Sequence, residues 1–197
     1  MKFFKNPLIL AILLALLSTA CNKKARTLSV DTLDSLKLTY QQINNELEFS
    51  WTEMMMDDDG KLENMRRILQ EISYSGEYSV VTHEGLKKEV EGLAALRYDR
   101  ETMSNSDLIT NYDDKTNTTM SGLMEFTTGL PQFEHYPLMG QLLQEVFEAD
   151  DRVLQYRIQY DRAVKSYNQF IEENEPYLEQ IANQEALPPK PLFELQE

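Results

Sequence analysis

Cys21 is the one cysteine among the 197 residues of the chain, and the residues before it predict a specific modification. It follows Leu17-Ser18-Thr19-Ala20, which resembles the lipobox that bacterial lipoprotein-processing enzymes cut before a cysteine that they acylate. A single cysteine also has no partner for an internal disulfide. We therefore expect Cys21 to carry fatty acyl chains, palmitate among them.

The residues before Cys21 have the form of an export signal. Lys2 and Lys5 give a positive start, and an unbroken apolar run follows over 8–17. This run is too short to cross a bilayer, which takes about 20 apolar residues. Two or three acyl chains hold a protein stably on a membrane. We expect a signal peptide over 1–20, a polar tether over 21–32 and a bacterial membrane on the extracytoplasmic side. No aspartate follows Cys21, which favours the outer membrane.

Two other sets of residues could hold a metal ion by type. The run Asp57-Asp58-Asp59-Gly60 suggests calcium, but a calcium loop with Gly60 at its sixth position would need acids where Met55 and Arg66 stand. The run predicts a solvated turn between two helices instead. His83 and His135 are the only histidines and lie far apart in the sequence. We expect no metal site.

Catalysis needs a nucleophile beside a base, and the sequence offers no such pair. Cys21 is used by the anchor, and neither histidine has a partner at a suitable spacing. No glycine-rich loop that could hold phosphate is present either. We expect no enzymatic activity and no cofactor.

Tyr156, Tyr160 and Tyr167 are the remaining candidates for a binding site. They could line an aromatic cleft for a glycan or a peptide. At heptad spacing, tyrosines more often fill a core with their hydroxyls at its rim. Both interpretations require one long helix to position the three side chains.

The segment that begins at Pro137 predicts that helix, because proline suits the first helical turn. Its apolar positions repeat every seven residues over four heptads: Met139, Leu142, Val146, Ala149, Val153, Tyr156, Tyr160, Ala163, Tyr167 and Phe170. Such a stripe faces a neighbouring helix, as in a coiled coil. Asp161 lies off the stripe and is expected to face water. Pro176 ends or kinks the helix.

Earlier segments carry the same periodicity. One heptad pattern runs from Leu33 to Met54 and stops at the acidic run, a second occupies 62–72, and helix resumes over 86–96. The stretch 73–81 is ambiguous between helix and strand. The polar stretch 104–118 predicts a loop, and a shorter helix follows over 120–130.

Amphipathic segments bury their apolar sides most simply against each other. The sequence therefore predicts an all-α protein, an elongated antiparallel four-helix bundle over 33–182 with a long C-terminal heptad helix. Pro188, Pro189 and Pro191 predict an extended tail over 183–197. Leu192, Phe193 and Leu195 could dock that tail on the bundle.

The last helix resembles the C-terminal signature of the LemA family. The matching positions lie between Tyr136 and Asn168: Tyr136, Pro137, Arg152, Val153, Arg157, Tyr160, Ala163, Val164, Tyr167 and Asn168. The resemblance implies a membrane-attached four-helix bundle outside the cytoplasm, with no agreed activity and no catalytic residues. It is weak in the first half of the chain, where Trp51 is the one point of likeness.

The net charge of −14 argues against nucleic acid as a partner, because phosphates repel an acidic surface. We expect a non-enzymatic envelope lipoprotein that acts as a protein-interaction or scaffold module. The surplus apolar residues of the last helix could recruit a partner: Leu143, Phe147, Ile158 and Val164. The alternative is a small-ligand carrier with an aromatic pocket between helices at Tyr156, Tyr160 and Tyr167.

Overall fold

The computed structural model describes residues 28–131 and 133–193, and every regular element in these ranges is helical. The prediction of an all-α protein is confirmed. No helix in the described ranges is long and apolar enough to cross a membrane. Cys21, the expected signal peptide and most of the expected tether lie outside the described residues.

The first long helix, α2, spans Val30–Ser75 without a break and is 46 residues long. The hydroxyl of Ser29 accepts a hydrogen bond from the amide of Thr32 at its start, and Gly76 ends it in the left-handed conformation at φ 78°. At 1.5 Å per residue α2 is roughly 69 Å long. Residues 30–32 therefore belong to the helix and not to the tether.

The predicted turn at Asp57–Gly60 is wrong, because these residues lie in the middle of α2. The buried stripe passes through them: Met54, Asp58, Lys61, Leu62 and Met65. Asp58 occupies a core position of the heptad pattern and is buried, whereas Asp59 and Gly60 of the same run are exposed.

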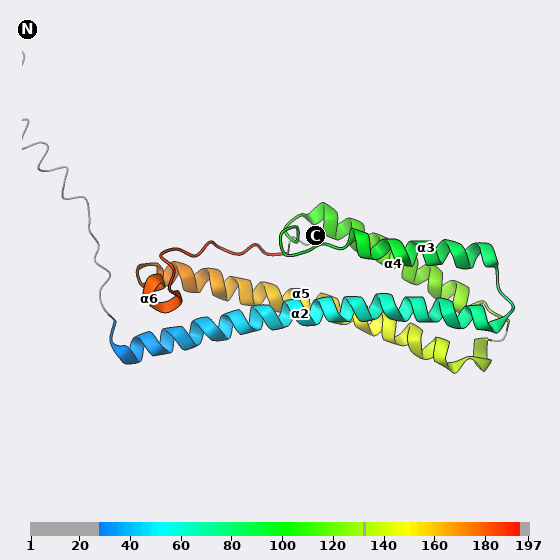
Figure 1. Ribbon diagram of the computed structural model, residues 1–197, viewed down its shortest axis with the longest axis horizontal. Coiled ribbons are helices and arrows are strands. Elements are labelled where there is room, and N and C mark those ends of the chain that lie inside the picture. The colour runs from blue at the N-terminus through cyan, green and yellow to red at the C-terminus, as the bar shows by residue number, and fades with distance from the viewer. Residues whose placement is uncertain (1–27, 132, 194–197) are drawn as a thin grey trace, which may run out of the picture.

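The second long helix, α5, spans Pro137–Glu173 and lies beside α2 along its length, with the chain running in the opposite direction (Figure 1). Pro137 is at its first turn, and the helix ends before Pro176, as predicted. The heptad stripe is buried at nine of its ten positions, Tyr156 being half-buried. The prediction of a long heptad helix is confirmed.

Two shorter helices, α3 (Val80–Leu96) and α4 (Ser106–Thr128), pack on each other and on only one end of the α2–α5 pair (Figure 1). The predicted loop over 104–118 is wrong, because α4 begins at Ser106 and Asn105 caps it. The buried stripe of α4 contains tyrosine and threonine besides apolar residues. Its members are Ile109, Tyr112, Thr116, Thr119, Met120, Leu123 and Thr127.

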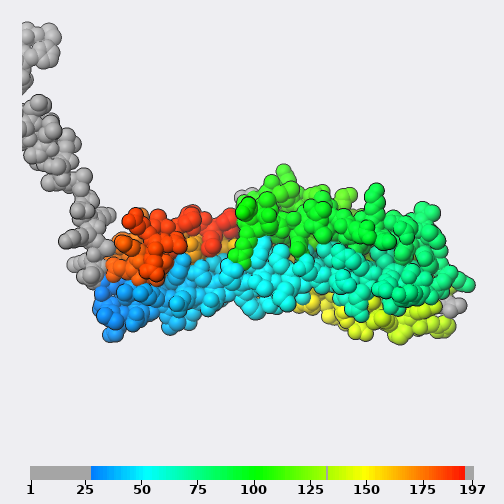
Figure 2. Space-filling model, viewed as in Figure 1, coloured from blue at the N-terminus to red at the C-terminus, as the bar shows by residue number. Residues whose placement is uncertain are grey.

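The C-terminal residues cover the other end of the pair. The short helix η1 (Phe133–His135) lies between α4 and α5, whereas η2 (Glu175–Tyr177) and α6 (Leu178–Ala182) follow α5. After α6, Asn183 adopts the left-handed conformation at φ 56°. The described tail, residues 183–193, then returns along α5 towards α3 and α4 (Figure 1). In Figure 2 the tail, drawn in red, continues the row that α4 and α3 form in green.

Candidate functional site

The three tyrosines of α5 do not surround one common space. Tyr160 and Tyr167 are buried and Tyr156 is half-buried. Each meets a different aromatic residue of α2, at ring-centroid distances of 5.7 Å for Tyr160 and Trp51, 6.3 Å for Tyr167 and Tyr40, and 6.3 Å for Tyr156 and Phe49. They fill the α2–α5 seam along roughly 16 Å of helix.

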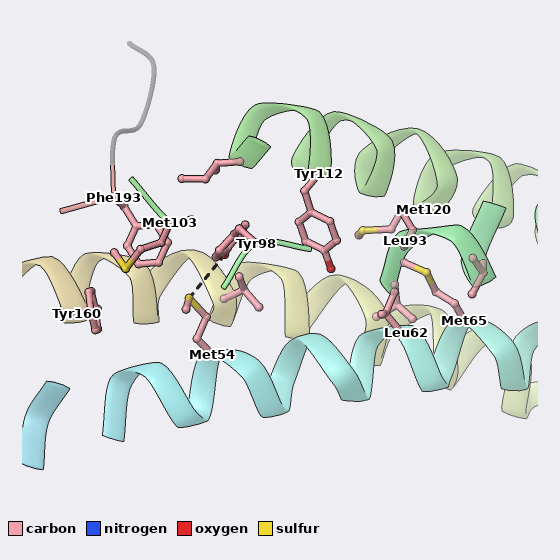
Figure 3. Close-up of a cluster of buried hydrophobic side chains, with 14 of the residues drawn as sticks. Met54, Leu62, Met65, Leu93, Tyr98, Met103, Tyr112, Met120, Tyr160 and Phe193 are labelled. Carbon is pink, nitrogen blue, oxygen red and sulfur yellow. Dashed lines mark hydrogen bonds between the residues drawn. The ribbon is translucent and has the colours of Figure 1, made fainter. Parts of the chain in front are cut away.

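The tail places Phe193 into an aromatic cage. The Phe193 side chain is 5% exposed. Its ring lies 5.6 Å from those of Tyr98 and Tyr160 and 6.3 Å from that of Trp51, and the Arg157 guanidinium is 5.8 Å from its centroid. Figure 3 shows Phe193 entering the buried cluster beside Tyr98, above Tyr160. The rings of Tyr98 and Tyr160 meet Phe193 edge to face and that of Trp51 stacks on it, and such aromatic contacts stabilise beyond the area that they bury.

Side chains of α5 also hold the backbone of the tail. The Asn168 amide donates to the Lys190 carbonyl over 2.9 Å and accepts from the Lys190 amide over 2.8 Å. Asp161 accepts from the Phe193 amide over 2.9 Å. The expectation that Asp161 faces water is wrong, because the tail covers it, and burial raises the pKa of its carboxyl. We call the surface formed by Trp51, Tyr98, Arg157, Tyr160, Asp161, Tyr167 and Asn168 the tail groove.

A group of buried charges lies at the middle of the molecule, where α2, α4 and α5 meet. Asp58 is 2% exposed and Lys61 is 1% exposed. The Lys61 ammonium lies 2.8 Å from an oxygen of Asp150 and 2.9 Å from Oδ1 of Asp58, the latter an ion pair without hydrogen-bond geometry. The other oxygen of Asp58 accepts from the Tyr112 hydroxyl over 2.6 Å, and Arg97 lies 3.3 Å from it.

A second ion pair continues this group towards the tail. Arg157 donates to both oxygens of Asp113, over 2.7 and 2.8 Å, and to the Tyr98 hydroxyl over 2.9 Å. Burial acts to lower the pKa of Arg157, but the hydrogen bonds and charge interactions with Asp113 and Tyr98 together outweigh it and raise the pKa, so the guanidinium is charged. Burial raises the pKa of Tyr98 to about 12. We call Asp58, Lys61, Arg97, Tyr112, Asp113, Asp150 and Arg157 the charge cluster.

Each carboxylate of the charge cluster faces a cation from a different part of the chain or from the next turn. The cluster therefore links α4 and the segment after α3 to the two long helices and holds these elements together. The sequence did not predict this cluster, because Asp58 was expected in a turn and Arg157 lies off the apolar heptad stripe. The spacing of Met54, Asp58, Lys61 and Met65 was the available signal, since it keeps the heptad register across the acidic run.

An open cleft lies at the end of the molecule opposite to Val30, between the first turn of α3 and the last turns of α4. Its volume is about 810 Å³. Two glutamates, Glu77 and Glu125, are its charged lining residues, and the others are small, polar or apolar: Tyr78, Ser79, Thr82, Leu86, Gly122, Phe126, Gly129, Leu130 and Pro131. Val81, on the same turn of α3, is 85% exposed. We call this the tip cleft; it was not anticipated from the sequence.

The histidines are not brought together. His83 is buried, with Nε2 2.9 Å from the Leu69 carbonyl oxygen and its ring 5.1 Å from that of Tyr78. His135 is exposed in η1. Within residues 28–131 and 133–193, no three His, Cys, Asp or Glu side chains are grouped so that they could hold a metal ion.

No family model, curated protein or solved structure matches the chain. The tail groove, the charge cluster and the tip cleft are therefore the features from which function is inferred. Of these, the tip cleft is open to a molecule from outside, whereas the tail groove already holds part of the chain.

Proposed function

We propose that this protein is a non-enzymatic lipoprotein of the bacterial cell envelope, similar to the LemA family, that binds another protein at the end of an antiparallel four-helix rod. The position of the tip cleft carries the proposal. The tether would join α2 at Val30, and α2 alone separates that point from the tip cleft by roughly 69 Å. An anchor at one end and an open cleft at the other suit a module that presents a binding site away from a membrane.

The chemistry of the tip cleft indicates the kind of segment that it would bind. Phe126, Leu86 and Tyr78 supply apolar surface, and Glu77 and Glu125 supply negative charge at its edge. A net charge of −14 adds a long-range attraction for cations. A partner segment with lysine or arginine beside apolar residues would complement both features.

Site-specific crosslinking in living cells tests this proposal. A photoreactive amino acid at Thr82, on the lining of the tip cleft, should give an adduct of one defined mass. The same amino acid at Gln169, an exposed position of α5, should not give that adduct. The double change Glu77→Lys and Glu125→Lys should abolish it, because it reverses the charge at the edge of the cleft. Equal adducts from Thr82 and Gln169, or an adduct that survives the charge reversal, would count against the proposal.

A small-ligand carrier is the second candidate function, and the volume of the tip cleft supports it. Small-ligand pockets occupy roughly 300–1,000 Å³, a range that includes the tip cleft at about 810 Å³. Tyr160 and Tyr167 do not favour it, since Trp51, Phe193 and Tyr40 cover their rings. Native mass spectrometry of protein purified from membranes tests the carrier function. A bound small molecule that Gly122→Leu displaces would favour the carrier over the adaptor.

A further inference from the structure

We infer that the tail groove is a peptide-binding site, and that the tail of a second copy of this chain can occupy it in exchange for the chain's own tail. The inference does not depend on the tip cleft or on the lipid. The tail is held by a different kind of contact from the one that holds the helices together. Inside the α2–α5 seam, side chains pack on side chains, whereas in the tail groove side chains of α5 bind main-chain atoms of an extended segment.

The bonds to the main chain are those of a site that binds extended peptides. Asn168 uses both atoms of its amide on Lys190, and Asp161 accepts from Phe193 three residues later. These bonds require an extended backbone in one register and do not depend on the tail's side chains. Proline on both sides of Lys190 restricts the free tail to extended conformations, which lowers the entropy lost on binding.

Two side chains of the tail supply specificity. Phe193 fills the cage of Trp51, Tyr98 and Tyr160, and the ammonium of Lys190 lies 5.0 Å from the centroid of the Tyr167 ring. Between and before them, Pro188, Pro189 and Pro191 are exposed. The groove therefore selects a lysine followed three residues later by phenylalanine, the pattern Lys-Pro-Leu-Phe of the tail itself.

The connection of the tail to the rod allows exchange. Residues 183–186 are exposed, and Asn183 is in the left-handed conformation just after α6, where the chain leaves the helix. From Asn183 to Phe193 a fully extended chain reaches about 35 Å, which exceeds the width of two helices at 10–12 Å each. The tail of one copy can therefore reach the groove of a neighbour that stands beside it.

A second copy is the occupant that the structure favours, because it carries the segment that is already seen to fit. Exchange of identical tails replaces every contact with the same contact, so that the two arrangements differ chiefly in the entropy of association. A high concentration of copies would reduce that entropic cost, since effective concentration sets the balance between binding within and between molecules.

Two complementary variants of the full chain test the inference. Phe193→Ala leaves the groove intact but removes the side chain that fills the cage. The double change Asp161→Ala and Asn168→Ala leaves the tail intact but removes the bonds that hold it. Sedimentation should show each variant monomeric alone and a one-to-one complex when they are mixed. Circular dichroism first verifies that both remain helical.

Trp51 provides an independent measurement, because it is the only tryptophan and its ring stacks on that of Phe193. A synthetic peptide of residues 183–197 added to the Phe193→Ala chain should shift the Trp51 emission and saturate. The same peptide with Phe193→Ala should bind at least about 100-fold more weakly, since it lacks the buried ring. If Phe193→Ala loses helix, Lys190→Pro replaces it, because proline removes the amide that donates to Asn168 and leaves the core unchanged.

The expected result is a complex from the mixed variants together with saturable, phenylalanine-dependent binding of the peptide. Helical variants that stay monomeric when mixed, with a Trp51 emission that the peptide does not change, would overturn the inference. Binding of the peptide without any complex between the variants would overturn the second copy as the occupant.

Discussion

At the scale of single residues, the most costly feature is the pair of opposite charges on the buried face of one helix. Asp58 and Lys61 lose nearly all contact with water, and removing an ion from water costs several kcal/mol. The loss is offset because Lys61 also meets Asp150, and Asp58 also meets Tyr112 and Arg97. These contacts come from α5, from α4 and from the segment after α3, so the buried pair on α2 links all of them.

Lys61→Ala should lower the free energy of unfolding by about 3–5 kcal/mol, because it leaves Asp58 buried without its nearest cation. Chemical denaturation measures the change. Lys87→Ala, at an exposed position of α3, serves as the control and should stay within about 0.5 kcal/mol of the original chain. Similar small losses from both variants would show that Asp58 is solvated.

The buried tyrosines predict a loss of stability at alkaline pH. An unfolded tyrosine ionises near pH 10, whereas burial raises the pKa of Tyr98 to about 12 in the folded chain. Because the folded pKa is the higher one, the contribution of Tyr98 is complete below pH 10 and is lost as pH rises from 10 to 12. The shift corresponds to about 3 kcal/mol.

Denaturation at pH 8 and pH 11 tests this expectation. Tyr98→Phe should reduce the difference between the two free energies of unfolding, because phenylalanine cannot ionise. Tyr74→Phe should leave the difference unchanged, since Tyr74 is exposed. An identical pH dependence in the original chain and in Tyr98→Phe would contradict the raised pKa.

At the scale of elements, the continuity of α2 through Gly60 decides the architecture. A turn at this point would give two shorter helices, whereas the continuous helix sets the length of the rod. The structure leaves open space around Gly60, with no atom within 4 Å of an added Cβ. Gly76 also has open space, but its φ of 78° is unfavourable for any residue with a side chain.

Gly60→Ala should therefore raise the free energy of unfolding by about 1 kcal/mol, because alanine is the better residue inside a helix. Gly76→Ala should lower it by a similar amount, because alanine is strained in the left-handed conformation. Thermal melts of the two variants measure these opposite changes. A turn at Gly60 would make both substitutions destabilising.

At the scale of the whole molecule, the two long helices α2 and α5 contact the remaining elements at different positions along their length. The helices α3 and α4 cover one end of α2 and α5, and the tail covers the other (Figure 2). Phe193 and Arg157 join the two regions, because the Phe193 ring lies against a guanidinium that is itself bound to Asp113 of α4. Release of the tail should therefore change the surroundings of Arg157 and Asp113 in the charge cluster.

The proposed attachment of this rod to a membrane rests on Cys21. Cys21→Ser should move the protein from the membrane fraction to the soluble fraction or leave it unprocessed, because acyl chains would supply nearly all of the membrane affinity. Cell fractionation measures the distribution, and mass spectrometry of the first peptide identifies the modification. An unmodified peptide that begins elsewhere would exclude the lipoprotein proposal.

The sequence by itself determined what depends on local periodicity: the all-α class, the helix from Pro137, and the stripe of α5 that faces α2. These follow because a helix places every third and fourth residue on one face whatever surrounds it. The predictions for residues whose environment depends on distant partners were wrong. The residues around Asp58 are typical of a turn, but in the folded chain Tyr112, 54 positions away, donates a hydrogen bond to it. The position of Asp161 off the apolar stripe is typical of a surface residue, but in the folded chain the amide of Phe193, 32 positions away, donates a hydrogen bond to it. Only the tertiary structure decides such cases, because the burial of a charge depends on the groups that meet it in space and not on its neighbours in the chain.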